Sequence, residues 1–444
     1  MDVGAVMRRY LSMHGYGAKA LFLIGLFSMT QIRLGAKIGI SEAVCCLIAP
    51  FLFMREIPLY KRDGVMIYFN LLILWMAGAL FADFYNHSVF QQFIRGVSVP
   101  IMIFSVSVCV YHYLRRDTSG LKWLLLGVAL SYVISTFVFQ RGSAGDLAAE
   151  EGLAAGAEKV MGYKLFWSNM AKTWLCLPIQ GWYQQVPMIF AIPVLIAVSV
   201  INLLAGGRSA FLVSTVSIFL VFIGGKRERA IQRIKRAFPV FAVGLLIVAG
   251  GIKWGYGYLA KNGYLNEYET EKYEKQTSRG SDVLSLLIAG RGDFFVGLFA
   301  ALDKPIVGHG SQAIDYYGYE RDYLSKYGSD AEIERYINME NRGRIRTIRS
   351  HSHVICYWMW HGVLGLLFWL YILYLVIITV KNRLAYIPEW FGYFAVVLPN
   401  FMWDFFFSPF GQRVEESVMF CTLLVLMKIS KDRKTLRFRQ MGVM

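Results

Sequence analysis

The run "VICYWMWHGVLGLLFWLYILYLVIITV", residues 354–380, decides the class of fold. A bilayer core about 30 Å thick is crossed by a helix of roughly 20 apolar residues. This run exceeds that length without one Asp, Glu, Lys or Arg. Ten further apolar runs lie near 18–33, 38–54, 64–83, 93–113, 121–139, 187–206, 209–225, 238–256, 390–406 and 414–430. The sequence therefore predicts an all-α, polytopic integral membrane protein.

The overall composition supports the same class. Hydrophobic residues make up 56% of the 444 residues and charged residues 17%, with a mean hydropathy of +0.45. These values are too apolar for a soluble globular protein. A net charge of +16 could indicate nucleic-acid binding, but the basic residues cluster in short loops between apolar runs, as the positive-inside rule expects. We therefore expect membrane lipids, and not nucleic acid, as partners of this charge.

The basic loops also set the expected topology. Residues 55–62, 226–236 and 428–439 are strongly basic and are predicted to be cytoplasmic. With these loops inside, the chain must cross the membrane once more between residues 140 and 186 than the apolar runs provide. The less apolar stretch 166–185 can supply this crossing. The prediction is about twelve transmembrane helices with both termini in the cytoplasm. Residues 1–256 would hold the first nine, 257–350 a long helical outer loop, and 351–444 the last three helices and a basic tail.

Arginines on the outer side are candidate ligand-binding residues, because positive charge is normally depleted there. Arginine stays charged and binds phosphate oxygens in pairs, so several that converge would suit a diphosphate. The alternative is that they reach lipid head groups or pair with acidic residues of the same segment. The candidates are Arg95, Arg208, Arg291, Arg346 and Arg349.

Histidines gather at the start of the opening run, where His351, His353 and His361 account for three of seven. His351 and His353 do not share a helical face, and no acidic residue lies between Glu340 and Glu389, so a metal site is not expected. A neutral imidazole can act as a general base, and His351 is the candidate. The alternative is that these histidines cap or pack at the start of the span, and His361 is expected to pack.

Three motifs resemble the O-antigen ligase family. His351-Ser352, nine residues, Gly362, two residues and Gly365 match its signature H-[NSQ]-x9-G-x2-[GTY]. "LLAGGRSAFLVS" (203–214) resembles its arginine-containing boundary before a span. "RGDFFVGLFAALDKPIVGHG" (291–310) resembles its arginine-led helix and Pro-x-x-Gly-x-Gly turn, with His309 where the family usually has Val. The resemblance covers about residues 165–380.

The resemblance implies a bacterial inner-membrane glycosyltransferase of lipopolysaccharide biosynthesis that works on the periplasmic face without a metal or cofactor. The donor would be a glycan on undecaprenyl diphosphate and the acceptor lipid A–core, with inversion at the sugar. His351 would be the base. The diphosphate and substrate would contact Arg208, Arg291, Arg349, Arg346, His353, His309 and Arg95.

Two other functions stay open from the sequence. A polysaccharide polymerase of the same superfamily would use a second lipid-linked glycan as its acceptor. A lipid or glycan transporter would carry out no chemistry, and twelve spans with both termini inside are common among transporters. The charged outer loop favours an enzyme.

Overall fold

The computed structural model describes residues 16–34, 36–137, 208–224, 291–328, 330–341, 346–383, 390–408 and 413–440, with a few single positions between 193 and 262. The predicted crossings at 166–185 and 238–256, and most of 187–206, lie outside these residues. The number of spans and the orientation of the chain therefore stay predictions.

The apolar runs that the structure describes are helical. Four helices are long and apolar enough to cross a membrane within the described residues, namely α3 (Ile40–Asp63), α4 (Met66–Tyr85), α5 (Phe90–Leu114) and α17 (His353–Ile378). The others that arise from these runs are α2 (Tyr16–Leu26), α6 (Gly120–Phe137), α10 (Arg208–Gly224), α18 (Phe391–Phe407) and α19 (Arg413–Gln440). A π-helical turn, η2 (Thr379–Arg383), follows α17. This largely helical, apolar architecture is that of a membrane protein.

The first predicted run needs a correction. We expected a helix over 18–33, but α2 ends at Leu26 and a two-stranded antiparallel hairpin follows, β1 (Gln31–Leu34) and β2 (Ala36–Gly39). The register pairs Ile32 with Ile38, and β-branched residues favour extended backbone. The fold is thus mainly α with one short hairpin, which leads directly into α3.

Aromatic side chains form the centre of the helix bundle. Trp75 of α4 stacks on Phe368 of α17 with ring centroids 4.9 Å apart. Trp369 meets Phe401 of α18 at 6.5 Å and Phe420 of α19 at 6.0 Å. All five rings are buried, and burial of such large apolar groups dominates packing energies. The core therefore joins α4, from the N-terminal part of the chain, to the C-terminal helices α17, α18 and α19.

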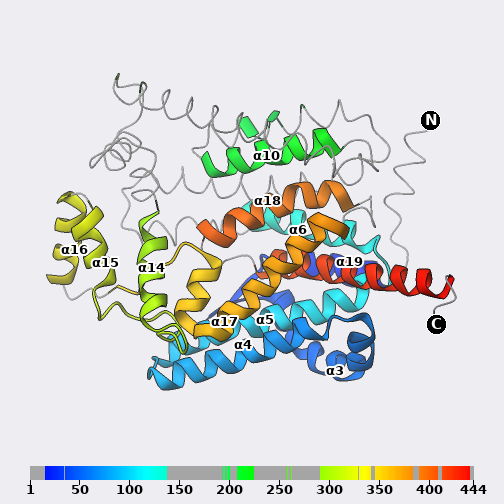
Figure 1. Ribbon diagram of the computed structural model, residues 1–444, viewed down its shortest axis with the longest axis horizontal. Coiled ribbons are helices and arrows are strands. Elements are labelled where there is room, and N and C mark those ends of the chain that lie inside the picture. Colours follow the sequence, from blue (N-terminus) through cyan, green and yellow to red (C-terminus); the bar gives the residue numbers. More distant parts are fainter. Residues whose placement is uncertain are drawn as a thin grey trace.

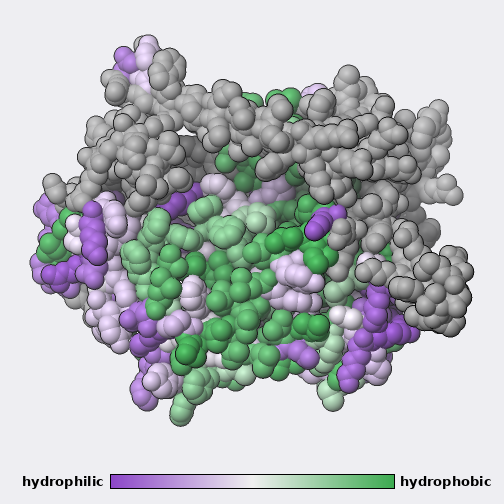
Figure 2. Space-filling model, viewed as in Figure 1, coloured by the Kyte–Doolittle hydropathy of each residue, from purple (hydrophilic) through white to green (hydrophobic). Residues whose placement is uncertain are grey.

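The long helices run roughly along one axis, and a smaller set of helices covers one end (Figure 1). There α14 (Gly292–Asp303) lies across the start of α17, with α15 (Tyr319–Tyr327) and α16 (Asp330–Asn341) beyond it. Figure 2 shows hydrophobic residues over the middle of the visible face and hydrophilic ones toward both ends. We call the end covered by α14 the α14 end. The opposite end, where α5 finishes and Arg115 follows it, is called the Arg115 end.

Candidate functional site

His351 and Asp293 form a polar pair at the α14 end. The Nδ1 atom of His351 lies 3.1 Å from Oδ2 of Asp293, and 46% of the histidine side chain is exposed. Asp293 stands in the first turn of α14, where the helix dipole favours a carboxylate. The predicted base thus has an acidic partner and an accessible ring.

The chain that leads to His351 is fixed against α14 and a neighbouring turn. The Ile348 N–H donates to the Ala313 carbonyl at 2.8 Å. Gly297 of α14 lets this segment pass closely, because a Cβ there would lie 2.7 Å from Cβ of Ser350. The imidazole is therefore presented by backbone that is held on two sides.

Ser352, the second residue of the His-Ser signature, ties α17 to α18. It is the N-cap of α17, and its hydroxyl accepts from the Ile355 N–H at 3.3 Å. The same hydroxyl donates to the Phe405 carbonyl at 2.9 Å. Side-chain capping of this kind satisfies a helix-start N–H, so the residue after His351 fixes where the span begins.

Gly362 bends α17 within the predicted span. Its φ of +63° and ψ of −152° are not helical, and L-residues with a side chain rarely adopt them. At the bend the Val363 N–H donates to the Ile306 carbonyl at 3.0 Å. A Cβ on Gly362 would lie 1.9 Å from that carbonyl oxygen, so only glycine fits here.

The turn after α14 donates hydrogen bonds to the backbone carbonyls that the bend leaves without helical partners. The His309 N–H donates to the Met359 carbonyl at 2.7 Å, and the Gly310 N–H to the Trp360 carbonyl at 3.0 Å. Two motifs that are separate in the sequence, the Pro-x-x-Gly-x-Gly turn and the signature glycine, therefore dock onto each other.

Arg291 lies at the N-cap position of α14, two residues before Asp293. Its guanidinium carbon is 4.9 Å from the ring centre of Trp403 and 5.1 Å from that of Phe407, both on α18. Burial lowers the pKa of Arg291, although an arginine stays charged at any physiological pH. A cation therefore stands at the same helix start as the His351–Asp293 pair.

Arg346 and Arg349 face an acidic residue of the same end. Nη1 of Arg346 lies 2.8 Å from Oε1 of Glu320 on α15. Burial raises the pKa of Glu320, and the guanidiniums of Arg346 and Arg349 oppose that shift. Arg346 thus shows the pairing with an acid of its own segment that the sequence left open, and the charge of Arg349 acts on the same carboxylate.

The remaining predicted contacts belong to other surroundings. His309 is buried, with Nε2 2.8 Å from the Ala300 carbonyl, and burial lowers its pKa. His353 is buried against Trp369, with ring centroids 5.2 Å apart. Arg95 of α5 donates to the Gln312 side chain at 3.3 Å. None of these described contacts joins the three residues to the His351–Asp293 pair.

Arg208 is the first residue of α10, and its side chain lies outside the described residues. Helix α10 packs against α18 (Figure 1), the helix that carries Trp403 and Phe407. The predicted role of Arg208 therefore stays a prediction.

A second polar cluster surrounds His361, which we expected only to pack. Trp75 Nε1 donates to Nδ1 of His361 at 2.8 Å, so the neutral ring carries its proton on Nε2 and donates to Ser311 Oγ at 2.9 Å. Ser311 Oγ in turn donates to Asp83 Oδ2 at 2.7 Å. A catalytic Ser–His–Asp set needs the serine to donate to histidine, so these bonds run the wrong way for a nucleophile. The cluster holds the turn to α4 and α17.

Sequence reasoning missed Asp293, Asp83 and Ser311. Asp83 stands in an apolar run, and a carboxylate there is by default a functional or structural feature. Asp293 follows Arg291 at a predicted helix start, a position that favours acidic residues. Its partnership with His351 has no local signal, because the two are distant in the sequence.

Comparison with known proteins identifies no relative: no family model, no curated protein and no solved structure matches this chain. The resemblance to the O-antigen ligase family therefore depends on the three motifs.

Proposed function

We propose that this chain is a membrane glycosyltransferase of the O-antigen ligase type, which transfers a glycan from undecaprenyl diphosphate to lipid A–core at the periplasmic face. The observation that carries the proposal is the His351–Asp293 pair at the start of α14, beside Arg291. It lies at a polar end of an apolar helix bundle, where a lipid-linked substrate could meet a water-soluble acceptor group.

The base in this reaction is Nε2 of His351. When the Nδ1–H of a neutral ring donates to Asp293, the lone pair of Nε2 points away from the carboxylate and can accept a proton. The acceptor hydroxyl loses its proton to Nε2 as its oxygen bonds to the anomeric carbon. The bond from that carbon to the diphosphate oxygen breaks with its electron pair, so the sugar inverts.

The leaving diphosphate needs positive charge rather than an acid. Arg291 supplies a guanidinium in a half-buried site, where charge interactions are stronger than in water. A guanidinium stacked over aromatic rings keeps its N–H edge for phosphate oxygens. The N-terminus of α14 adds partial positive charge at the same place. We include Arg208 as a second diphosphate-binding residue because its motif at 203–214 resembles the arginine-containing boundary of the O-antigen ligase family.

The decisive experiment gives the purified protein a lipid-linked glycan and, in separate reactions, lipid A–core or a second lipid-linked unit, without divalent metal. We expect lipid A–core to be capped. Lengthening of the lipid-linked chain would make the protein a polymerase, and inactivity with both acceptors would contradict the enzyme proposal and favour transport.

Variants then test the residues. His351→Asn should lower the transfer rate by about 10²–10⁴-fold, the usual contribution of a general base, and Arg208→Ala and Arg291→Ala should also abolish most transfer. His87→Asn is a matched control, because His87 is an exposed histidine with a φ of +50° that asparagine also tolerates. Normal transfer by His351→Asn would refute the base assignment.

A further inference from the structure

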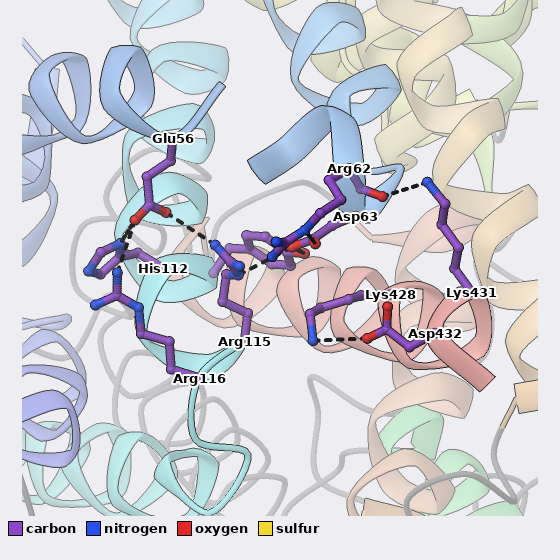
Figure 3. Close-up of polar contacts among 10 residues, drawn as sticks. Glu56, Arg62, Asp63, His112, Arg115, Arg116, Lys428, Lys431 and Asp432 are labelled. Atoms are coloured by element: carbon purple, nitrogen blue, oxygen red, sulfur yellow. Dashed lines mark hydrogen bonds and ion pairs between the residues drawn. The ribbon is translucent and has the colours of Figure 1, made fainter. Parts of the chain in front are cut away.

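The Arg115 end contains a buried ion cluster that the proposed chemistry does not use. Glu56 and Asp63 of α3 are both buried, and Arg115 lies between them, with Nη1 3.8 Å from Glu56 Oε2 and Nε 3.2 Å from Asp63 Oδ2 (Figure 3). His112 Nδ1 also approaches Glu56 Oε1 at 2.6 Å. Two carboxylates are thus held by an arginine that is itself buried.

Three further arginines lean on the same carboxylates from outside. Arg55 lies 3.9 Å from Glu56 and Arg116 lies 3.3 Å from it, measured between the nearest nitrogen and oxygen atoms, and their side chains are 66% and 57% exposed. Arg62 lies 3.6 Å from Asp63, and its side chain is 68% exposed. We call these three residues the guanidinium rim. Four arginines in this cluster share two carboxylates, which leaves a surplus of at least two positive charges whether or not His112 is protonated.

An apolar stripe on α3 leads to this rim. Its members are strongly exposed, at 74%, 79% and 70%, and follow each other at helical spacing: Leu47, Phe51 and Met54. Arg55 and Arg62 continue the exposed face, because residues seven apart return to the same side of a helix. Glu56 and Asp63 occupy the opposite, buried face. One helix face therefore carries a long apolar surface that ends in guanidinium groups.

We propose that this face binds an anionic phospholipid, with an acyl chain along the apolar stripe and head-group phosphate on the guanidinium rim. Guanidinium groups bind phosphate oxygens in pairs, and the surplus charge of the cluster is the complement of a phosphate. The two carboxylates pre-orient the rim arginines, and the four arginines of the cluster outweigh their negative charge. The rim is spread over two carboxylate positions, so a lipid with two phosphates, such as diphosphatidylglycerol, fits better than one with a single phosphate.

A lipid-retention experiment on the purified full chain tests this. Native mass spectrometry from a non-ionic detergent would measure bound lipid after addition of diphosphatidylglycerol, phosphatidylglycerol or phosphatidylcholine at equal concentration. We expect retention in that order. Equal retention of phosphatidylcholine and the anionic lipids would overturn the proposal, as would full displacement of the anionic lipid by millimolar inorganic phosphate, which would show a site for the free ion.

The variant Arg55→Gln/Arg62→Gln/Arg116→Gln should weaken retention of the anionic lipids about fivefold for each cation removed, and roughly a hundredfold in total. If that variant does not fold, Arg55→Lys/Arg62→Lys/Arg116→Lys is tested in its place. It keeps the charge and should retain much of the binding. The control is Arg321→Gln/Lys326→Gln, which removes two exposed cations of α15 at the other end. An equal loss in the control would overturn the assignment to the rim.

Discussion

At the scale of single residues, Asp293 decides which nitrogen of His351 carries the proton. The carboxylate lies 3.1 Å from Nδ1 and can accept its hydrogen, which leaves Nε2 as the basic atom. The same charge would stabilise the imidazolium that forms when the base accepts a proton. Asp293 is therefore a positioning residue in the proposed reaction, and His351 is the group that touches substrate.

We expect Asp293→Asn to lower kcat by about 10²-fold or more and to leave KM nearly unchanged. The amide removes the negative charge and can donate to Nδ1, which favours the wrong tautomer. The loss cannot exceed that of removing the base, about 10²–10⁴-fold. Steady-state transfer assays measure both constants.

Asp293→Glu should restore part of the rate, because it returns the charge. The control is Asp303→Asn at the other end of α14, where the carboxylate accepts from the Tyr319 hydroxyl at 2.6 Å and asparagine can still accept. Wild-type kcat in Asp293→Asn would remove this residue from the proposed mechanism.

At the scale of secondary structure, the bend in α17 gives the signature glycine a mechanical reason. The bend releases backbone carbonyls inside an apolar environment, where an unpaired polar group is costly. The turn after α14 supplies the missing N–H groups. A second attachment, from Ser311 to the buried Asp83, holds the same turn to α4. The turn is thus a wedge that fixes α14, and with it Asp293, against the span.

Gly362→Ala should destabilise the protein by about 1–3 kcal/mol or more, since alanine would have to adopt a positive φ and its Cβ would clash with the Ile306 carbonyl. Thermal unfolding in detergent measures the change. Leu367→Ala, on an exposed position of the same helix, is the control and should stay within about 0.5 kcal/mol. An unchanged unfolding temperature for Gly362→Ala would contradict this account of the bend.

At the scale of the whole molecule, the two ends differ in the kind of charge they carry. The Arg115 end joins α3, α5 and α19 through arginines, lysines and buried carboxylates (Figure 3). The α14 end carries acidic and basic residues in mixed pairs, such as Arg346 with Glu320. The positive-inside rule therefore predicts that the Arg115 end lies in the cytoplasm and that the proposed site lies on the opposite side of the membrane.

Thiol labelling of intact cells would test this orientation. In a chain whose six cysteines are replaced by alanine, a cysteine at Ser325 of α15 should react with a membrane-impermeant reagent once the outer membrane is permeable. A cysteine at Lys61, at the end of α3, should react only after lysis. Both positions are exposed, so access to reagent depends on the side of the membrane. Labelling of Lys61→Cys in intact cells would contradict the predicted orientation and indicate the opposite one.

Prediction from the sequence succeeded where the signal is continuous along the chain. Long apolar runs gave α4, α5 and α17 close to their observed ends, because a helix in lipid must satisfy its own backbone and extend across the bilayer. Helix α3 begins where predicted but continues beyond the run at 38–54 to Asp63, so that residues 55–62, expected as a loop, are helical. It failed at Leu26, where a hairpin replaces the second half of a predicted span. An apolar run that polar residues shorten does not by itself distinguish a helix from a strand. Packing against the neighbouring helices then decides which of the two it adopts.

The sequence alone determined the membrane class, the apolar helices and the motif that marks His351, because each depends on residue types at short spacing. Only the tertiary structure decided that Asp293 is the partner of His351, that Gly362 receives a turn from another segment, and that His361 belongs to a bonded cluster. These contacts join segments far apart in the chain. Their geometry depends on how helices pack, which spacing along one chain does not encode.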